Sequence, residues 1–355
     1  MILLSAIFNL LLILFVLGLL WLLKRWKFQY PIVMVLLCGV LLIVLSLTAA
    51  LVSPAVHFGQ IQLMAWVIFF HCLIYLGGVA ILFFKSKPAF AIGSAGVGVC
   101  ILLIGLYASL IEPRWLENSH LTLSNAKLQE SIRVAVIADL QTDNPGDYEE
   151  EVLNDVKREE PDLILLAGDY LQLREQDRSP AAQEMLHDIF LRVGLNAPLG
   201  IYAVRGNVDP IPFWQEIFDG LPIMIFETSS SLDLGPIVLT GLTLEDSENI
   251  HLSIGGKEKF HIVLGHKPDF SLGEIEADLL IAGHTHGGQF QIPFIGPIMT
   301  LSAVPRAWAS GMTTISPGKI LLVSRGIGME RGNAPRMRFN CRPELVILDL
   351  VLSEE

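Results

Sequence analysis

The residues RVAVIAD at positions 133–139 form a short apolar run that ends on an aspartate, and LILLAGD at 163–169 repeats the pattern. Runs of this length, rich in Val, Ile and Leu, are typical of strands buried on both faces of a sheet. Between them, residues 147–160 predict a helix, because the first turn is acidic and Pro161 follows the last residue. This strand–helix–strand order predicts an α/β domain.

The alternation continues to the C-terminus. We expect a further helix over 180–193 and further strands over 201–204, 237–240, 261–264, 279–282, 320–324 and 345–350. Polar residues come at or just after the ends of five of the apolar runs: Asp139, Asp169, Asn207, His266, His284 and His286. Sites in open α/β sheets form at the carboxyl ends of strands. Carboxylate, amide oxygen and imidazole suit Mn, Fe or Zn, so this edge is predicted to bind divalent cations.

The first 111 residues have a different composition. They contain no Asp or Glu, and four apolar runs at about 2–23, 31–52, 61–84 and 89–111 are each long enough to cross a membrane as a helix. We expect a transmembrane segment of about four helices at 1–111, a linker at 112–130 and a second domain at 131–355. All 36 acidic residues follow position 111, with 19 of the 24 basic ones, a net charge of −17. Such an acidic domain argues against nucleic acid as a partner.

Basic residues predict the orientation in the membrane. Those of the apolar part lie in the loops after the first and third runs: Lys24, Arg25, Lys27, Lys85 and Lys87. The loop between the second and third runs, 53–60, has none. The positive-inside rule therefore places the two basic loops in the cytoplasm. With four spans, the acidic domain is expected outside the cytoplasm, on a multi-pass protein of the cell membrane. We expect the spans to act as an anchor, and a hydrogen bond to a neighbouring helix to account for His71 within the third run.

Five motifs, taken in order, resemble those of calcineurin-like metallophosphoesterases. They are Ile137-Ala138-Asp139, Ala167-Gly168-Asp169, Arg205-Gly206-Asn207-Val208-Asp209, Gly265-His266 and Gly283-His284-Thr285-His286-Gly287-Gly288-Gln289. With Ser324–Gly328 and Arg342-Pro343-Glu344 they look like the membrane-associated branch, which includes exported phosphoesterases and UDP-2,3-diacylglucosamine pyrophosphatases. The resemblance covers about 131–351.

The resemblance implies a four-layer αββα sandwich and two divalent cations, with Mn favoured over Fe, Zn or Mg. Asp169 would bridge both cations, which would hold a nucleophilic hydroxide. Asp139 and His286 would bind the first cation; Asn207, His266 and His284 would bind the second. The residues expected to act in catalysis are Asn207, Asp209 and Asp169. Arg325 and Arg331 are candidates for gripping substrate phosphate, with structural salt bridges as the alternative.

Two positions depart from the family pattern, which has histidine at both. Gln141 follows Asp139, where it could bind the first cation through its side-chain oxygen, favouring Mn or Mg, or could simply cap backbone groups. Val208 follows Asn207 and can neither stabilise nor protonate a leaving group, help that is typically worth about 10²–10⁴-fold. The leaving group is therefore a good one, another residue supplies the proton, or activity is low. A catalytically weak or inactive metal-binding module is the alternative function.

The expected substrate is a phosphorylated small molecule or a lipid-linked phosphoester or pyrophosphate. The stretch 294–308 is apolar for a loop and rich in Pro and Gly. It either enters the bilayer near the site, which would favour lipid-linked substrates, or packs on the core of its own domain.

Overall fold

The computed structural model describes residues 2–26, 29–55, 57–173, 180–210 and 213–353. It divides into two compact units. One comprises Met1–Ser109 and Asn333–Arg336, and the other comprises Leu110–Gly332 and Met337–Glu355. The division near residue 110 falls close to the expected end of the apolar segment.

The first unit is helical. Its helices are α1 (Ile2–Arg25), α2 (Pro31–Leu51), α3 (His57–Trp66), α4 (Cys72–Phe83) and α5 (Pro88–Leu106). A π-helical turn, Val67–His71, joins α3 and α4, so the described residues contain four helical segments long and apolar enough to cross a membrane. As expected, a hydrogen bond accounts for His71: its Nε2 lies 2.8 Å from Asn9 Oδ1 on α1. Lys27 of the first basic loop lies outside the described residues.

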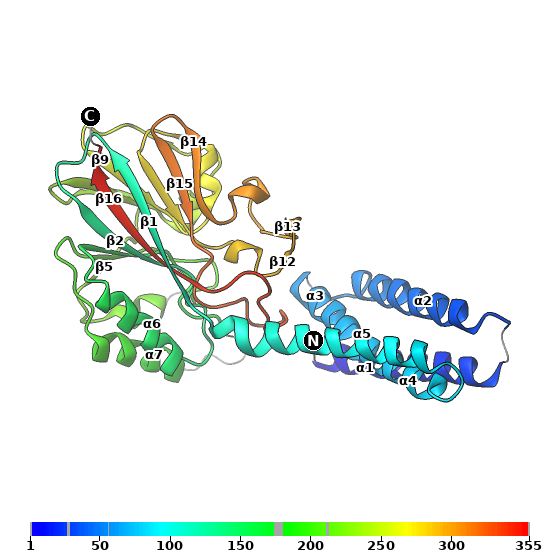
Figure 1. The fold of residues 1–355 in the computed structure, drawn as a ribbon. Coiled ribbons are helices and arrows are strands. Elements are labelled where there is room, and N and C mark those ends of the chain that lie inside the picture. Colours follow the sequence, from blue (N-terminus) through cyan, green and yellow to red (C-terminus); the bar gives the residue numbers. More distant parts are fainter. Residues whose placement is uncertain (1, 27–28, 56, 174–179, 211–212, 354–355) are drawn as a thin grey trace. The chain divides into compact units, whose positions relative to one another are not determined.

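The second unit contains two six-stranded sheets (Figure 1). The first has the order β1 (Glu117–Asn125), β16 (Glu344–Leu352), β2 (Ile132–Ile137), β3 (Leu163–Leu166), β4 (Ile201–Ala203) and β5 (Ile223–Ile225). The second has the order β14 (Gly311–Ser316), β15 (Lys319–Val323), β11 (Leu279–Ala282), β9 (Phe260–Leu264), β7 (Ile237–Gly241) and β6 (Ser230–Asp233). Strands β2 to β5 are parallel to one another, as are β7, β9, β11 and β15. Each sheet therefore brings the carboxyl ends of several strands to one edge.

The sheets pack face to face through apolar side chains, which include Val134 and Leu165 from the first and Leu239 and Ile281 from the second. Helices α6 (Asp147–Arg158) and α7 (Pro180–Val193) cover the outer face of the first sheet. The outer face of the second sheet is covered by the short α8 (Leu244–Ser247) and by a 3₁₀ segment, Pro268–Leu272. The predicted αββα sandwich is confirmed, with short turns forming most of the outer layer on the second sheet.

Local sequence explains the helix that follows β2. Glu149 accepts a hydrogen bond from the Gly146 N–H at 2.9 Å, which satisfies one of the free donors at the start of α6. Acidic residues occupy its first turn and Lys157 and Arg158 its last, as the helix dipole favours. The helix ends two residues before the predicted limit.

Part of the expected linker at 112–130 is ordered structure, because it contains the nine-residue strand β1. This strand pairs in parallel with β16, from Glu117 opposite Glu344 to Asn125 opposite Leu352. Leu123 and Leu128 are buried between the sheets. The alternation of apolar and polar residues in 119–124 is the signal of a half-buried edge strand.

Replacing Leu123, which is 8% exposed, tests this assignment. Leu123→Asp places an unpaired charge between the sheets and removes a buried side chain, so the melting temperature should fall by about 10 °C. Ser124→Asp, on the exposed face of the same strand, should change it by no more than about 2 °C. Thermal unfolding of the detergent-purified chain measures both; equal, small effects would restore the linker assignment.

Candidate metal centre

The predicted ligands lie along one rim of the sandwich, where the parallel strands of both sheets end. Asp139 follows β2, Asp169 follows β3 and Asn207 follows β4, in the first sheet. His266 follows β9, and His284 and His286 follow β11, in the second sheet. The ligands follow strand ends, as the sequence predicts, and the structure shows that they come from two different sheets.

The backbone at this rim is strained. Most candidate ligands have a left-handed conformation: Asp139 (φ 51°), Gln141 (φ 34°), Asp169 (φ 56°), His284 (φ 69°) and His286 (φ 48°). For residues other than glycine this conformation costs about 1–2 kcal/mol each. Such strain persists only where the surroundings fix it, and it concentrates at functional sites. Its clustering here marks the rim as a site.

Three side chains form the centre of the site. One ligand atom each from Asp169, His266 and His284 lies within 4.8 Å of the others. His266 Nδ1 donates to the Ala167 carbonyl at 2.8 Å, which leaves Nε2 facing Asp169 Oδ2 at 3.3 Å and Asn207 Oδ1 at 3.0 Å. A backbone carbonyl that accepts the other ring N–H commonly orients a histidine that binds a metal.

Asp139 and His286 lie beside this cluster but outside it. Both Asp139 oxygens accept the His284 backbone N–H, at 3.0 and 3.1 Å. His286 Nδ1 lies 3.3 Å from Nη2 of Arg338, a residue that is fully buried. Asp139 therefore fixes the backbone of His284, a member of the cluster. His286 contacts Arg338, which holds the loop after β15.

Gln141 is buried and its amide is held in one orientation. Its Nε2 donates to Gln172 Oε1 and to Glu330 Oε2, both at 3.0 Å. Both N–H groups of the amide are thereby used. Its Oε1 is buried and has no hydrogen-bond partner among the described residues. Because an unsatisfied buried acceptor costs about 1–3 kcal/mol, a cation is the partner that this oxygen fits.

The electrostatics also fit a cation. Burial raises the pKa of Asp139 to about 7, and the charge of Asp169 adds to the effect. Burial, together with the charge of His266, lowers the pKa of His284 to about 3, so His284 is neutral and can bind a metal. Burial lowers the pKa of His266, but Asp169 outweighs it and raises the value to about 9. A metal bound here must therefore displace a proton from His266.

Asp209, predicted to act in catalysis, supports the backbone instead. Its Oδ2 accepts the N–H groups of Asp169 and Gly206, at 2.9 and 2.7 Å, and its Oδ1 accepts that of Tyr170 at 2.6 Å. The carboxylate is buried and ties the loop after β3 to the loop after β4. It is a positioning residue for Asp169, and the predicted direct role is corrected on that ground.

The two arginines proposed to grip phosphate are engaged elsewhere. Arg325 Nη2 lies 3.1 Å from Glu117 Oε2 and 3.0 Å from Glu344 Oε1. Arg331 Nε donates to the Gln141 carbonyl at 3.0 Å. The structure favours the structural alternative for both.

Sequence reasoning missed three supporting residues. Arg338 is fully buried and donates to the carbonyls of Arg325, Gly326 and Gly328, which holds the loop after β15. Gln172 and Glu330 orient Gln141, as described above. No motif distinguishes them in the sequence, because each acts through contacts that only the fold creates.

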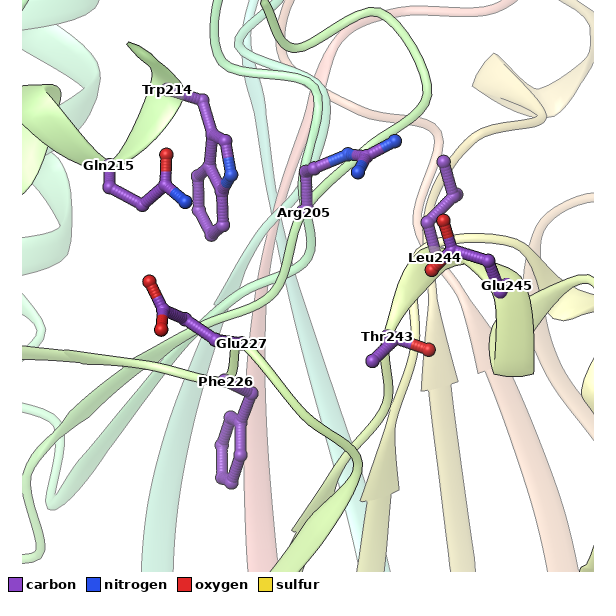
Figure 2. Close-up of a pocket in the computed structure, with 8 residues that line it drawn as sticks. All are labelled: Arg205, Trp214, Gln215, Phe226, Glu227, Thr243, Leu244 and Glu245. Atoms are coloured by element: carbon purple, nitrogen blue, oxygen red, sulfur yellow. The ribbon is translucent and has the colours of Figure 1, made fainter. Parts of the chain in front are cut away.

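A small pocket of about 110 Å³ lies at the same rim (Figure 2). Its walls follow β4, β5 and β7 and comprise Arg205, Phe226–Glu227 and Thr243–Glu245, with Trp214 and Gln215. Arg205 begins the loop that carries Asn207, so one wall of the pocket and one candidate ligand belong to the same loop.

Comparison with known proteins agrees with the rim chemistry. Residues 132–288 match the family of calcineurin-like phosphoesterases. An uncharacterized metallophosphoesterase of Bacillus subtilis, YkuE, is 27% identical over 264 residues, covering 69% of this chain and 88% of that protein. The UDP-2,3-diacylglucosamine pyrophosphatase LpxG of Chlamydia muridarum is 25% identical, over 70% of this chain and 93% of its own. Phosphodiesterase YaeI of Escherichia coli is 34% identical over 93 residues, 25% of this chain and 32% of its own.

Asp209→Asn separates a positioning role from a catalytic one. The amide has only one acceptor oxygen, so at least one buried N–H loses its partner, and the variant should be destabilised by about 3 kcal/mol. Mn binding should weaken because Asp169 shifts. Calorimetric melting and metal analysis measure the two effects, with the exposed Asp219→Asn as the control. Lost hydrolysis with unchanged stability and metal content would restore the direct role.

Proposed function

Because the chain is a metallophosphoesterase with a calcineurin-like phosphoesterase domain at 132–288, we propose that it hydrolyses phosphoester or pyrophosphate bonds at two divalent cations held by this rim. The observation that carries the proposal is the convergence of Asp169, His266 and His284 within 4.8 Å at the ends of strands from two sheets. The unpartnered Gln141 Oε1 supports it.

In this proposal Asp169 would be a ligand of both cations. Asp139, Gln141 and His286 would hold the first, and Asn207, His266 and His284 would hold the second. The donor set of the first contains two oxygen ligands besides Asp169, which favours Mn, with Fe, Zn or Mg as alternatives. Bound by these residues, two divalent cations would supply a hydroxide nucleophile and neutralise the charge of the phosphate.

The protein's own residues position these ligands. The Val208 backbone N–H donates to Asp169 Oδ1 at 2.9 Å, so the loop after β4 orients the carboxylate even without a histidine side chain. Asp209 fixes the same loop by accepting the Gly206 N–H at 2.7 Å. The pocket beginning at Arg205 offers space for the part of the substrate that departs.

Val208 limits the class of substrate. Without a proton donor at this position, a leaving group that is already stable as an anion reacts best, such as a phosphate in a pyrophosphate or a phenol-like alcohol. The name of the Chlamydia muridarum relative, a pyrophosphatase of a lipid-bearing nucleotide sugar, supports a pyrophosphate or lipid-linked substrate.

We also propose that the domain lies outside the cytoplasm, because the basic residues of the apolar segment lie in the loops after α1 and α4.

Val208 also favours a second candidate function, a metal-binding module with weak or no activity. Gln141, in place of the family's histidine, is a second departure. The candidate ligands that remain argue against the module, because strained backbone at five of the seven positions would have no use in a decayed site.

The enzyme proposal predicts Mn-dependent turnover of bis(p-nitrophenyl) phosphate by the detergent-purified chain. Asp169→Asn removes the negative charge of the ligand that both cations would share. Turnover should therefore fall at least about 10²-fold. Asp188→Asn, an exposed change on α7, should leave it unaltered. Turnover that is absent in the unmodified chain, despite two bound Mn ions, would favour the module.

Gln172→Leu tests the orientation of Gln141. The change removes the acceptor at 3.0 Å that fixes the amide, so Oε1 is no longer held towards the cation. The Kd for Mn should rise by about 10–100-fold, as for other outer-shell partners. Titration calorimetry measures it, with Gln183→Ala on α7 as the control. An unchanged Kd would show that Gln141 does not contribute to binding the cation.

A further inference from the structure

An exposed apolar hairpin follows the site histidines. Strands β12 (Gln291–Ile292) and β13 (Gly296–Pro297) pair in antiparallel fashion and are labelled in Figure 1. We call residues 291–301 the apolar hairpin. Its large apolar side chains are exposed: Ile292 (37%), Phe294 (108%), Ile295 (66%), Ile298 (56%), Met299 (38%) and Leu301 (49%). Of the two alternatives for 294–308, packing on the core holds only for the later part, where Val304 is buried.

The exposure is a property of the fold. Phe294, at the tip, has a φ of 68°, a conformation that bulky residues rarely adopt. The backbone is therefore held in a strained state while the aromatic ring faces outward. Clusters of exposed apolar side chains on a folded domain mark surfaces that bind a partner or a membrane.

Charge indicates which partner. Residues 279–329 contain no Asp or Glu, although the rest of the domain is strongly acidic. The exposed Arg306 Nη1 donates to the Pro297 carbonyl at 3.3 Å, so a cation lies against the hairpin. The carboxylate that contacts the chain just after the hairpin, Asp269, is 9% exposed and accepts the Ala303 N–H at 2.8 Å. Exposed apolar side chains at a tip with a flanking arginine are suited to a lipid surface with anionic headgroups.

The apolar hairpin is also tied to the candidate metal centre. His284 Nε2 donates to the Leu301 carbonyl at 3.1 Å. A Cβ added to Gly288 would lie 3.0 Å from the Met299 carbonyl oxygen, so the chain after the histidines packs closely against the hairpin. A surface that binds the hairpin therefore comes close to His284.

We propose that the apolar hairpin inserts into a lipid surface and that the site acts on phosphoesters whose apolar end is held in that surface. A bilayer is the occupant we choose, because a chain with four membrane-length apolar helices is kept at a high effective concentration of lipid. The second half of the proposal rests on the proposed function; insertion of the hairpin does not.

Insertion is tested with the full chain in nanodiscs of phosphatidylcholine and phosphatidylglycerol. Phe294→Cys, in a background with the exposed Cys100 replaced by serine, carries an environment-sensitive fluorophore. Brominated acyl chains should quench its emission and leave unquenched the same fluorophore at Glu258→Cys, in an exposed loop. A label at 294 that is unquenched overturns insertion; a blue-shifted but unquenched label assigns the surface to protein, either a second copy or another chain.

The substrate class is tested with dodecyl and methyl p-nitrophenyl phosphate in the same nanodiscs. Phe294→Asn keeps the left-handed backbone, which asparagine tolerates, and removes the apolar ring. The ratio of kcat/KM for the dodecyl ester to that for the methyl ester should fall about tenfold. This is the effect expected when an aromatic ring is no longer buried in the lipid. The methyl ester should react at an unchanged rate.

Leu191→Asn, at an exposed leucine of α7, is the control and should leave the ratio unaltered. An unchanged ratio in Phe294→Asn, with both esters hydrolysed, overturns the assignment of the substrate class. Failure of the unmodified chain to hydrolyse either ester overturns the proposed function instead, and the quenching result still decides insertion.

Discussion

The convergence of buried carboxylates at the ends of parallel strands is the constraint on which the site depends. Asp139 and Asp169 are almost inaccessible to solvent, and each repels the charge of the other. The chain can hold them together only because neighbouring backbone approaches closely: a Cβ at Gly283 would lie 2.8 Å from Asp139 Oδ2. A divalent cation relieves the repulsion that this packing creates. Within the protein, protonated His266 offsets part of this negative charge beside Asp169, and a bound cation would replace that proton.

The supporting residues show how that arrangement is maintained. Asp209 joins two loops through backbone amides. Arg338 donates to the carbonyls of a third loop and contacts the imidazole Nδ1 of His286. Neither needs to touch a substrate. They fix the positions of the candidate ligands before any cation binds. This lowers the conformational-entropy cost of ordering those side chains on binding.

Much of this could be predicted from the sequence, for reasons that lie in local chemistry. Apolar runs ending in Asp139 and Asp169 indicated both the strands and the rim, because the residues that follow parallel strands meet at one edge of a sheet. Strand β1 was missed because its alternation is weak and its partner, β16, is more than 200 residues away along the chain. The roles of Asp209 and Gln172 depend on contacts between loops, so the residue types could not reveal them. The apolar character of 294–301 was visible, but exposure is a tertiary property.

The central claim is that this rim binds two cations, and anomalous X-ray scattering from crystals grown with Mn tests it most directly. The account predicts two anomalous peaks about 3.5–4 Å apart, with Asp169 between them and Gln141 Oε1 directed at the one nearer Asp139. A single peak, or two peaks with the Gln141 oxygen turned away, would contradict it.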